Sequence, residues 1–599
     1  MLSPITVSLG VLVMVEISRI IHILESIVRV PSYSLLGTAS ERIVYLSTLE
    51  GVLSLWSMDK DGGNRKRLTI KSIHGVALPR LESPYVIFIR DVSRGQELHK
   101  VFYVDARGGD EKLLADTPLM RIFGIGFDGS KVAFTGATAE ENAIYIAKFD
   151  GSWEKIYRLD RLAFVTDVEG KYIVGYGNLR GDPRTFEIFV YNLETNEFKA
   201  YTPKPGSQNK VPIIRNGKIL FESNHEGKNR LYLYDPETGI LEKVKFKYPD
   251  YEEFDPVEHD SYGWTIDGVI WAVGKKNGRS RLFLDGKYVK LPEGTIHGHP
   301  VFINGKAFVA VSNLLRPPRI LEVDVEKGET RVVVENKLPE DIEKSLGEVQ
   351  FVKYKSFDEL EIPMYVALSN DASRPGPSIV YVHGGPWSEV CDAWNIMIAA
   401  LVAAGYHVLA PNFRGSTGYG DDFRILDIGD PGGGDLEDVV HAAKWGISNK
   451  IADPDRVAVM GYSYGGYMTY LAMGKYPKIW RCGIAGAGIV DWEEMYGLSD
   501  AIFRQFIDVL FASKKELWRE RSPITYVDNV EKPLCIVHPQ NDTRTPLKPV
   551  LRYIGRLLEK GRTFEVHVAP DMGHVIVKMD DAVKILLPAL IFLERYLKQ

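Results

Sequence analysis

This sequence of 599 residues contains little cysteine and little glutamine, and it has no large excess of charge of either sign. Its three cysteines, Cys391, Cys482 and Cys535, are odd in number and suggest no disulfide framework, so we expect an intracellular, cytoplasmic protein. Glutamine occurs only six times, which together with scarce cysteine favours a heat-adapted, thermophile source. The 73 basic side chains nearly balance the 79 acidic ones, and a net charge of -6 provides no basic surface for nucleic acid.

Long hydrophobic runs are also absent. The apolar stretch from Leu2 to Val15 is interrupted by polar residues, lacks a basic leader and a cleavage site, and is followed by Glu16. It is too short for a membrane span and unsuited to a signal peptide, so no membrane partner is expected. Beyond it, helical spacing predicts an amphipathic helix over 14–29 that packs on the body of the protein. Met14 is a second candidate for the first residue.

A Gly-x-Ser-x-Gly pentapeptide, Gly461-Tyr462-Ser463-Tyr464-Gly465, is the most informative motif of the chain. It follows an apolar run at 457–460 and precedes a helix-like segment at 466–473. Between a buried strand and a helix, this pattern is typical of the nucleophile elbow of α/β-hydrolases, whose tight turn needs small neighbours and presents the serine hydroxyl to substrate. A glycine-rich turn that merely contains a serine is the alternative. The context favours a serine hydrolase with Ser463 as nucleophile.

The other members of a catalytic triad are expected downstream, the acid first and the histidine second. Asp542 and His574 each lie on a loop that follows an apolar strand. Because a serine hydroxyl is a weak nucleophile, His574 would take its proton and Asp542 would fix the imidazole. Asp571 is a rival acid, although a residue so close to the histidine more often caps its own turn. His538 and His567 lie within the strands, where a structural role is expected.

An oxyanion hole is expected from an earlier strand and the loop that follows it. The buried strand 377–382 runs into the segment 383–387, which reads HGGPW. Glycine lets a backbone N–H approach a developing oxyanion without a side chain in the way. The N–H groups of Gly385 and of Tyr464, the residue after the nucleophile, are therefore the predicted donors. A simple tight turn is the alternative, which the elbow downstream disfavours.

The length of the chain predicts at least two domains. Residues 36–345 show almost no helical periodicity, and short alternating strands lead into acidic or glycine-rich turns. Seven such hairpins follow one another at steps of 46, 45, 44, 41, 50 and 39 residues, and they are marked by Asp59, Asp105, Asp150, Glu194, Asp235, Asp285 and Asp324. A repeat near 44 residues matches four strands per blade, which predicts a seven-bladed β-propeller over 36–345. Residues 346–599 are predicted to form an α/β-hydrolase domain with a mostly parallel, doubly wound sheet, and 1–35 an extension whose helix packs on it.

This arrangement resembles the prolyl oligopeptidase family of serine peptidases, and within it the acylaminoacyl peptidase branch, particularly the archaeal members. The resemblance covers essentially the whole chain. It is carried by HGGP at 383–386, NFRGSTGYG at 412–420, GYSYGGYM at 461–468, VDW at 490–492, HPQND at 538–542 and DMGH at 571–574.

The resemblance implies hydrolysis of short peptides with a blocked N-terminus, releasing an N-acyl amino acid, without a metal or other cofactor. The propeller would keep folded proteins from Ser463. The resemblance also implies an apolar substrate pocket lined by Trp492, Phe503 and Phe506, with ordinary core packing as the alternative. Arg544 resembles a family residue near the substrate, which would hold a carbonyl or carboxylate or pair with a nearby acid. A homodimer through the hydrolase domain is expected by analogy.

Other functions stay open on the sequence alone. A dipeptidyl aminopeptidase would need acidic residues for a free N-terminal ammonium, and Tyr251-Glu252-Glu253 faintly resembles the paired glutamates used there, although it reads more readily as solvated surface. A carboxylesterase is a second alternative, since the triad would cleave activated esters as a side activity in any case. A catalytically idle interaction protein is the third, and the Ser463, Asp542 and His574 set disfavours it.

Overall fold

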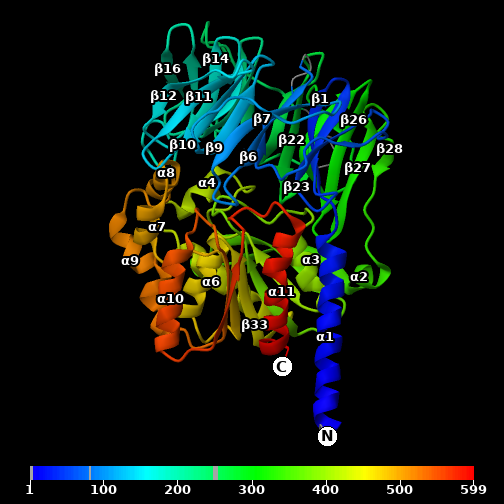
Figure 1. The fold of residues 1–599 in the computed structure, drawn as a ribbon, viewed down its shortest axis with the longest axis vertical. Helices are drawn as coiled ribbons and strands as arrows, with labels where there is room; N and C mark the ends of the chain where they lie inside the picture. The colour runs from blue at the N-terminus through cyan, green and yellow to red at the C-terminus, as the bar shows by residue number, and fades with distance from the viewer. Residues whose placement is uncertain (1–3, 80–82, 247–253, 599) are drawn as a thin grey trace.

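The computed structural model describes residues 4–79, 83–246 and 254–598, and the side chains of its first helix from Glu16 onward. Figure 1 shows antiparallel sheets in the upper part and an α/β unit below them. The sheets come from residues 33–334, and the α/β unit begins with the strand at Leu346. The two parts meet across a broad interface, and the site described below lies there.

Tight hairpins account for the strand-rich upper part. Asn216, Asn277 and Asn304 each precede a glycine and have φ of 51°, 52° and 51°. Asn-Gly pairs with positive φ form the type I′ turns whose twist matches that of the flanking strands. Each strand between such turns buries apolar side chains against the neighbouring sheet, so the sheets stack around a common axis as in a β-propeller.

Within the described residues, five four-stranded sheets of this part stand alone. Their strands are β5 Gly75–Val76, β6 Tyr85–Asp91, β7 His99–Asp105, β8 Lys112–Leu113; β9 Arg121–Phe127, β10 Lys131–Ala137, β11 Asn142–Lys148, β12 Trp153–Leu159; β13 Ala163–Glu169, β14 Tyr172–Gly177, β15 Glu187–Asn192, β16 Glu197–Tyr201; β17 Asn209–Arg215, β18 Lys218–Ser223, β19 Arg230–Tyr234, β20 Leu241–Lys243; β21 Glu258–Trp264, β22 Ile270–Lys276, β23 Arg279–Leu284 and β24 Lys287–Val289.

The first and last segments of the propeller share one eight-stranded sheet of order β28-β27-β26-β25-β1-β2-β3-β4. Its strands are β1 Tyr33–Ala39, β2 Arg42–Ser47, β3 Ser54–Met58, β4 Lys66–Arg67, β25 Thr295–Ile303, β26 Lys306–Asn313, β27 Arg316–Asp324 and β28 Thr330–Val334. β1 and β25 are joined in parallel at Leu35 and Gly298. This join is possible because Gly298 has φ of 74° and no Cβ, which would overlap the Leu35 carbonyl oxygen. The predicted propeller is present: five of its sheets stand alone, and its first and last four-stranded segments share the eight-stranded sheet.

The lower part is an eight-stranded sheet of order β29-β30-β32-β31-β33-β34-β35-β36. Its strands are β29 Leu346–Lys355, β30 Glu361–Ser369, β31 Gly376–Val382, β32 His407–Pro411, β33 Ala452–Tyr462, β34 Cys482–Gly486, β35 Leu534–Pro539 and β36 Phe564–Ala569. From β32 to β36 neighbouring strands are parallel, and β29 and β30 are antiparallel. The predicted mostly parallel α/β-hydrolase sheet is confirmed.

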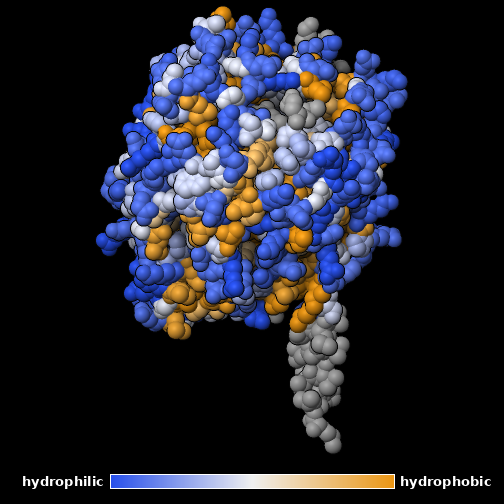
Figure 2. Space-filling view, turned by 45° about the horizontal axis from the view of Figure 1, so that its top comes forward, coloured by the Kyte–Doolittle hydropathy of each residue, from blue (hydrophilic) through white to orange (hydrophobic). Residues whose placement is uncertain are grey.

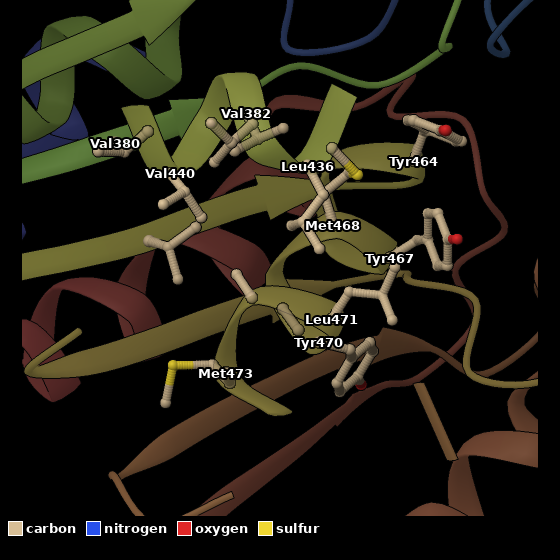
Figure 3. Close-up of a cluster of buried hydrophobic side chains, with 14 of the residues drawn as sticks. Val380, Val382, Leu436, Val440, Tyr464, Tyr467, Met468, Tyr470, Leu471 and Met473 are labelled. Carbon is tan, nitrogen blue, oxygen red and sulfur yellow. The ribbon is translucent and has the colours of Figure 1, made fainter. Parts of the chain in front are cut away.

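Helices cover both faces of this sheet (Figure 1). They are α2 Glu340–Ser345, α3 Ile396–Ala403, α4 Asp421–Arg424, η1 Ile425–Asp427, α5 Gly434–Ser448, α6 Tyr464–Lys475, α7 Trp492–Leu498, α8 Ala501–Leu510, η2 Lys515–Leu517, α9 Trp518–Arg521, η3 Pro523–Asn529, α10 Leu547–Glu559 and α11 Met579–Tyr596. Figure 3 shows the core on one face, where Val380 and Val382 of β31 meet Leu436 and Val440 of α5 and the apolar side of α6. This packing fixes α6, and therefore the residue that precedes it.

The first helix, α1 Pro4–Val28, begins about ten residues before the predicted start near residue 14. Proline suits the first turn of a helix, where its missing N–H would have no partner in any case. Ile20, Ile23 and Leu24 are buried against the core that α3 and α11 also form. In the described part of the chain, we find no helix with the length and apolar character needed to cross a membrane. Figure 2 shows a mostly hydrophilic surface with apolar side chains in scattered groups.

Candidate active site

Ser463 lies at the turn between β33 and α6 with φ of 60° and ψ of -120°, a backbone conformation that costs an ordinary residue free energy. The turn is tight because its neighbours are glycines. A Cβ on Gly465 would overlap the Val382 carbonyl oxygen, and one on Gly466 would overlap the Gly486 carbonyl oxygen. The hydroxyl therefore projects from the carboxyl end of the central strand, as the elbow motif predicts.

A continuous chain of hydrogen bonds links the serine, a histidine and an aspartate. His574 Nε2 lies 2.8 Å from Ser463 Oγ, and His574 Nδ1 lies 2.7 Å from Asp542 Oδ2. The Asp542 carboxylate also accepts from the N–H groups of Arg544 and Thr545, at 2.9 and 2.8 Å. The structure thus brings together the three residues that the sequence singled out from the ends of β33, β35 and β36.

The electrostatics of this chain determine which nitrogen carries the proton. Burial would raise the pKa of Asp542, but the charge and hydrogen bond of His574 outweigh it and lower that pKa below its ordinary value. An ionised carboxylate only accepts, so Nδ1 of His574 donates to it. Nε2 is left to accept from the Ser463 hydroxyl, which is the arrangement that a general base requires.

The rival residues have other surroundings. Asp571 lies on a turn with φ of 53°, and the carboxylate next to His574 is that of Asp542. His538 is fully buried, and its Nε2 lies 2.7 Å from the Thr545 carbonyl oxygen, as expected for a structural histidine.

The two predicted oxyanion donors flank the serine. A Cβ built on Gly384 would lie 4.0 Å from Ser463 Oγ, so the loop after β31 passes beside the hydroxyl. Gly385 has φ of 125°, and Tyr464 is the first residue of α6, where a backbone N–H has no partner within the helix. Among the described residues, neither of these N–H groups donates to a protein acceptor. Both are available to a negatively charged oxygen.

The first residue of the oxyanion loop, His383, anchors it. Its imidazole stacks on Phe413 with ring centroids 4.3 Å apart, and its Nε2 lies 2.9 Å from Ser416 Oγ. Burial lowers the pKa of His383 to about 4, so the side chain is neutral near pH 7. A neutral, hydrogen-bonded imidazole holds the loop without adding charge to the site.

A ring of aromatic side chains lies between the two parts of the molecule. Neighbouring ring centroids are 5.3–6.4 Å apart along a closed path through Phe123, Phe164, Tyr176, Phe186, Trp387, Phe506 and Phe503. The first four belong to the propeller, and all except Phe186 keep part of their surface accessible. Phe503 and Phe506 therefore lie at the interface between propeller and hydrolase, and their role in a substrate pocket stays a prediction.

Trp492 is packed in the core. It begins α7, and its side chain is fully buried beneath α6, with ring centroids 5.1 Å from Tyr467 and 5.0 Å from Phe511. The alternative of ordinary core packing therefore describes Trp492 in this structure, and a role in a substrate pocket stays a prediction.

Arg544 is paired with an acid, the second of its two predicted roles. Its guanidinium donates to both carboxylate oxygens of Glu97, at 2.8 and 2.5 Å. Glu97 comes from the propeller and also contacts Arg121. In the part of the chain that the structure describes, no group of three or more His, Cys, Asp or Glu side chains is arranged to hold a metal ion.

Two known families match successive parts of the chain. Residues 44–321 match the family described as acylamino-acid-releasing enzyme-like, N-terminal domain, and residues 392–599 match the prolyl oligopeptidase family. The first match covers most of the propeller, and the second covers most of the α/β unit. Ser463, Asp542 and His574, which follow β33, β35 and β36, fall inside the matched carboxyl-terminal part.

Individual relatives match about a third of the chain. Dipeptidyl aminopeptidase BIII of Pseudoxanthomonas mexicana is 32% identical over 226 residues, 36% of this chain and 33% of that protein. The acylamino-acid-releasing enzyme of Homo sapiens is 29% identical over 230 residues, 37% of this chain and 31% of that protein. The matched part thus spans about a third of each relative. An acylaminoacyl peptidase structure from Pyrococcus horikoshii is 20% identical, with a TM-score of 0.70 over 96% of this chain and 98% of that one, which shows the shared fold.

Members of the site contributed by the propeller were missed in the sequence. The loop between β6 and β7 lies against the loop that carries Asp542, where Asn541 Nδ2 donates to the Arg94 carbonyl oxygen at 2.8 Å and Thr543 Oγ1 to that of Gln96 at 3.1 Å. A Cβ on Gly95 would overlap the backbone of Gly573, next to His574. Gly95 has a positive φ, but a glycine in the sequence does not by itself reveal a positive φ or a contact with the hydrolase part.

Replacing Gly95 by alanine is therefore expected to lower kcat about 10- to 100-fold, because the new methyl group displaces the loop that carries His574. Steady-state hydrolysis of an activated ester measures this. Gly129→Ala is the matched control, since Gly129 has φ of 96° against 100° for Gly95 but nothing within 4 Å of the added Cβ. Equal losses in both variants would assign the effect to backbone strain and contradict the expected displacement.

Proposed function

We propose that this chain is a serine peptidase that hydrolyses short N-acylated peptides and releases an N-acyl amino acid. The observation that carries the proposal is the unbroken hydrogen-bonded chain from Ser463 through His574 to Asp542 at the face covered by the propeller. The match of residues 392–599 to the prolyl oligopeptidase family and the similarity to an acylamino-acid-releasing enzyme support it.

The proposed reaction follows from the geometry. His574 takes the proton of Ser463 as the hydroxyl attacks the scissile carbonyl, and Asp542 stabilises the imidazolium. The N–H groups of Gly385 and Tyr464 hold the oxyanion of the tetrahedral intermediate. His574 then protonates the leaving amine, and water repeats the steps on the acyl-enzyme. No step requires a metal or cofactor, and activated esters would be cleaved as a side reaction.

Substrate binding is proposed at the aromatic ring between propeller and hydrolase. Phe503 and Phe506 present accessible apolar surface, which suits an apolar side chain next to a neutral acyl group. Glu97 satisfies Arg544, so in this state the arginine is not free to bind a substrate carboxylate. Folded proteins would be excluded because the propeller covers the site.

A dipeptidyl aminopeptidase is the second candidate, favoured by the relative of that name in Pseudoxanthomonas mexicana. The segment Tyr251-Glu252-Glu253, which would have to bind a free N-terminal ammonium, lies outside the described residues. A carboxylesterase remains the weaker reading, since an ester alone gives the propeller no role.

One assay separates these functions. A single peptide is offered with an acetylated and with a free N-terminus, and the products are identified by mass. Cleavage of only the acetylated form, with release of an N-acetyl amino acid, is expected. Removal of two residues from the free form would instead support the dipeptidyl function, and cleavage of neither peptide alongside turnover of an ester would support an esterase.

We also propose the domain borders 1–35, 36–345 and 346–599. The start of β29 at Leu346 supports the last border, whereas β1, Tyr33–Ala39, crosses the first border and favours a start of the propeller before Tyr33. The eight-stranded propeller sheet is proposed to act as two blades, because β1 and β25 pair only at Leu35 and Gly298. With the five separate sheets, this would give seven blades of four strands.

A homodimer through the hydrolase part is proposed as well. Leu551 and Leu558 are 53% and 70% exposed and lie seven residues apart on α10, where they would form one apolar strip. Light scattering on the purified protein would test the dimer.

Free Cys391, Cys482 and Cys535 support a reducing, cytoplasmic compartment. The heat-adapted source stays a prediction.

A further inference from the structure

Two buried aspartates lie beneath the segments that carry the proposed oxyanion donors. Asp427 ends the short helix η1, and Asp435 lies in the first turn of α5. Their exposed fractions are 1% and 0%. Neither contacts Ser463, His574 or Asp542, and the reaction described above does not use them. A buried carboxyl group is costly unless it is hydrogen-bonded, so each needs a structural or functional reason.

Asp427 holds the loop of the first donor. The Trp387 Nε1–H donates to Asp427 Oδ1 at 3.2 Å, and Trp387 follows Gly385 by two residues. The indole is fixed on its other sides by Phe506, with ring centroids 5.3 Å apart, and by the Arg424 guanidinium 5.6 Å from its centroid. With the indole held in this way, the backbone of the short segment from Gly385 to Trp387 has little freedom.

Asp435 holds the residue of the second donor. The Tyr464 hydroxyl donates to Asp435 Oδ2 at 2.5 Å, and the same oxygen accepts from the Gly432 N–H at 3.1 Å. The backbone N–H of Tyr464 is the proposed donor, so this hydrogen bond fixes the side chain of the residue that faces the oxyanion. Each donor is thus tied through its own segment to one of the two carboxyl groups.

We propose that Asp427 and Asp435 are a pair of positioning residues for the oxyanion hole, acting through the Trp387 indole and the Tyr464 hydroxyl. This inference rests on the proposed function. It gives a role to two carboxyl groups whose burial is otherwise costly. It also assigns a role to the Trp387 N–H, which an oxyanion loop does not itself require.

Hydrogen bonding decides which substitutions imitate the pair. Burial, with the neighbouring charge of Asp435 added, raises the pKa of Asp427 well above its usual range. Burial raises the pKa of Asp435 to about 6. Asp427 accepts from the Trp387 indole through Oδ1, and its Oδ2 has no hydrogen-bond partner among the described residues. Asparagine keeps an acceptor oxygen for the indole N–H, whereas alanine removes it.

The test compares Asp427→Asn with Asp427→Ala in ester hydrolysis. We expect Asp427→Ala to lower kcat about 10- to 100-fold with KM changed less than about threefold, because oxyanion donors act in the transition state. Asp427→Asn is expected to stay within about threefold of the natural enzyme. A purely structural role would lower the yield of folded protein in both, without this split. Equal losses in the two variants, or natural kcat in Asp427→Ala, would overturn the proposal.

Two further variants keep the test decisive if Asp427→Ala does not fold. Trp387→Phe removes the indole N–H and Tyr464→Phe removes the hydroxyl, while both leave the aspartates and the backbone donors. Each is expected to lower kcat about tenfold. The double variant Trp387→Phe, Asp427→Ala should lower kcat no more than Asp427→Ala alone does, because both substitutions remove the same hydrogen bond. Natural kcat in both single variants would refute the pair.

The same set separates this inference from the proposed function. If Ser463→Ala still hydrolyses substrate at the natural rate, the proposed serine mechanism itself fails. If Ser463→Ala is inactive while Asp427→Ala, Trp387→Phe and Tyr464→Phe all retain natural kcat, the serine mechanism stands and the positioning pair is wrong.

Discussion

Replacing Ser463 by alanine is expected to lower kcat on the order of 10⁶-fold, because the side chain that forms the acyl-enzyme is removed. Only one oxygen is lost, so His574 and Asp542 keep their mutual hydrogen bond and the fold is unchanged. Ester hydrolysis by the purified variant measures the loss of kcat. Circular dichroism of the variant and the natural protein shows whether the fold is unchanged. Natural activity in a folded Ser463→Ala protein would show that another residue is the nucleophile.

A second substitution at Ser463 tests whether the backbone strain is real. With φ of 60° and ψ of -120°, the position suits glycine better than any residue with a Cβ. Ser463→Gly should therefore be as inactive as Ser463→Ala, yet more stable than it by about 1–2 kcal/mol. Chemical denaturation of the two inactive variants gives the difference. A Ser463→Gly protein that unfolds more readily than Ser463→Ala would contradict a strained elbow.

The residues of the candidate site in the α/β part could be predicted because their signals are local. A strand, a tight glycine turn and a helix surround Ser463 within about twenty residues, and Asp542 and His574 each follow a strand of the same sheet. Parallel strands bring their carboxyl ends to one edge, so residues far apart in sequence meet there without further information. Repeats near 44 residues likewise reveal the propeller, because each blade is one local unit.

The contacts between propeller and hydrolase could not be predicted in this way. Glu97 and Arg544 are 447 residues apart, and neither carries a motif that names the other. The propeller residues of the aromatic ring could not be predicted for the same reason, since Phe123 and Phe164 look like ordinary strand residues in the sequence. Closure of the propeller sheet at Leu35 and Gly298 is also non-local, so the hairpin period counts repeats but does not show which sheets merge.

Trp492 illustrates a different limit. It is an aromatic residue at the start of a helix near the site, and spacing alone does not say whether the first residue of α7 faces the core or the interface. Phe503 and Phe506, three apart on α8, face the propeller. The orientation is set by tertiary packing, with Tyr467 and Phe511 closing around the indole of Trp492.

Replacing Glu97 by glutamine is expected to lower the free energy of unfolding by about 3–5 kcal/mol. The Glu97 side chain is 3% exposed and is shared by Arg121, which is 5% exposed, and by Arg544, which is 27% exposed. Glutamine cannot balance two guanidinium charges, so both remain between propeller and hydrolase without their shared anion. Glu25→Gln is the matched control, because Glu25 and Arg29 form an exposed pair at 3.3 Å whose loss should cost less than about 0.5 kcal/mol.

The pH dependence of this loss identifies its electrostatic origin. Burial would raise the pKa of Glu97, but the hydrogen bonds and charge of Arg544, with Arg121, outweigh burial and lower it from 4.5 to about 2. A lowered pKa in the folded state means that the ion pair stabilises the protein above pH 4.5 and that this contribution is lost as the pH falls from 4.5 towards 2. Glutamine does not titrate. The difference in unfolding free energy between natural protein and Glu97→Gln should therefore be constant near neutral pH and shrink below pH 4.5, whereas a difference that stays constant down to pH 2 would assign the loss to packing.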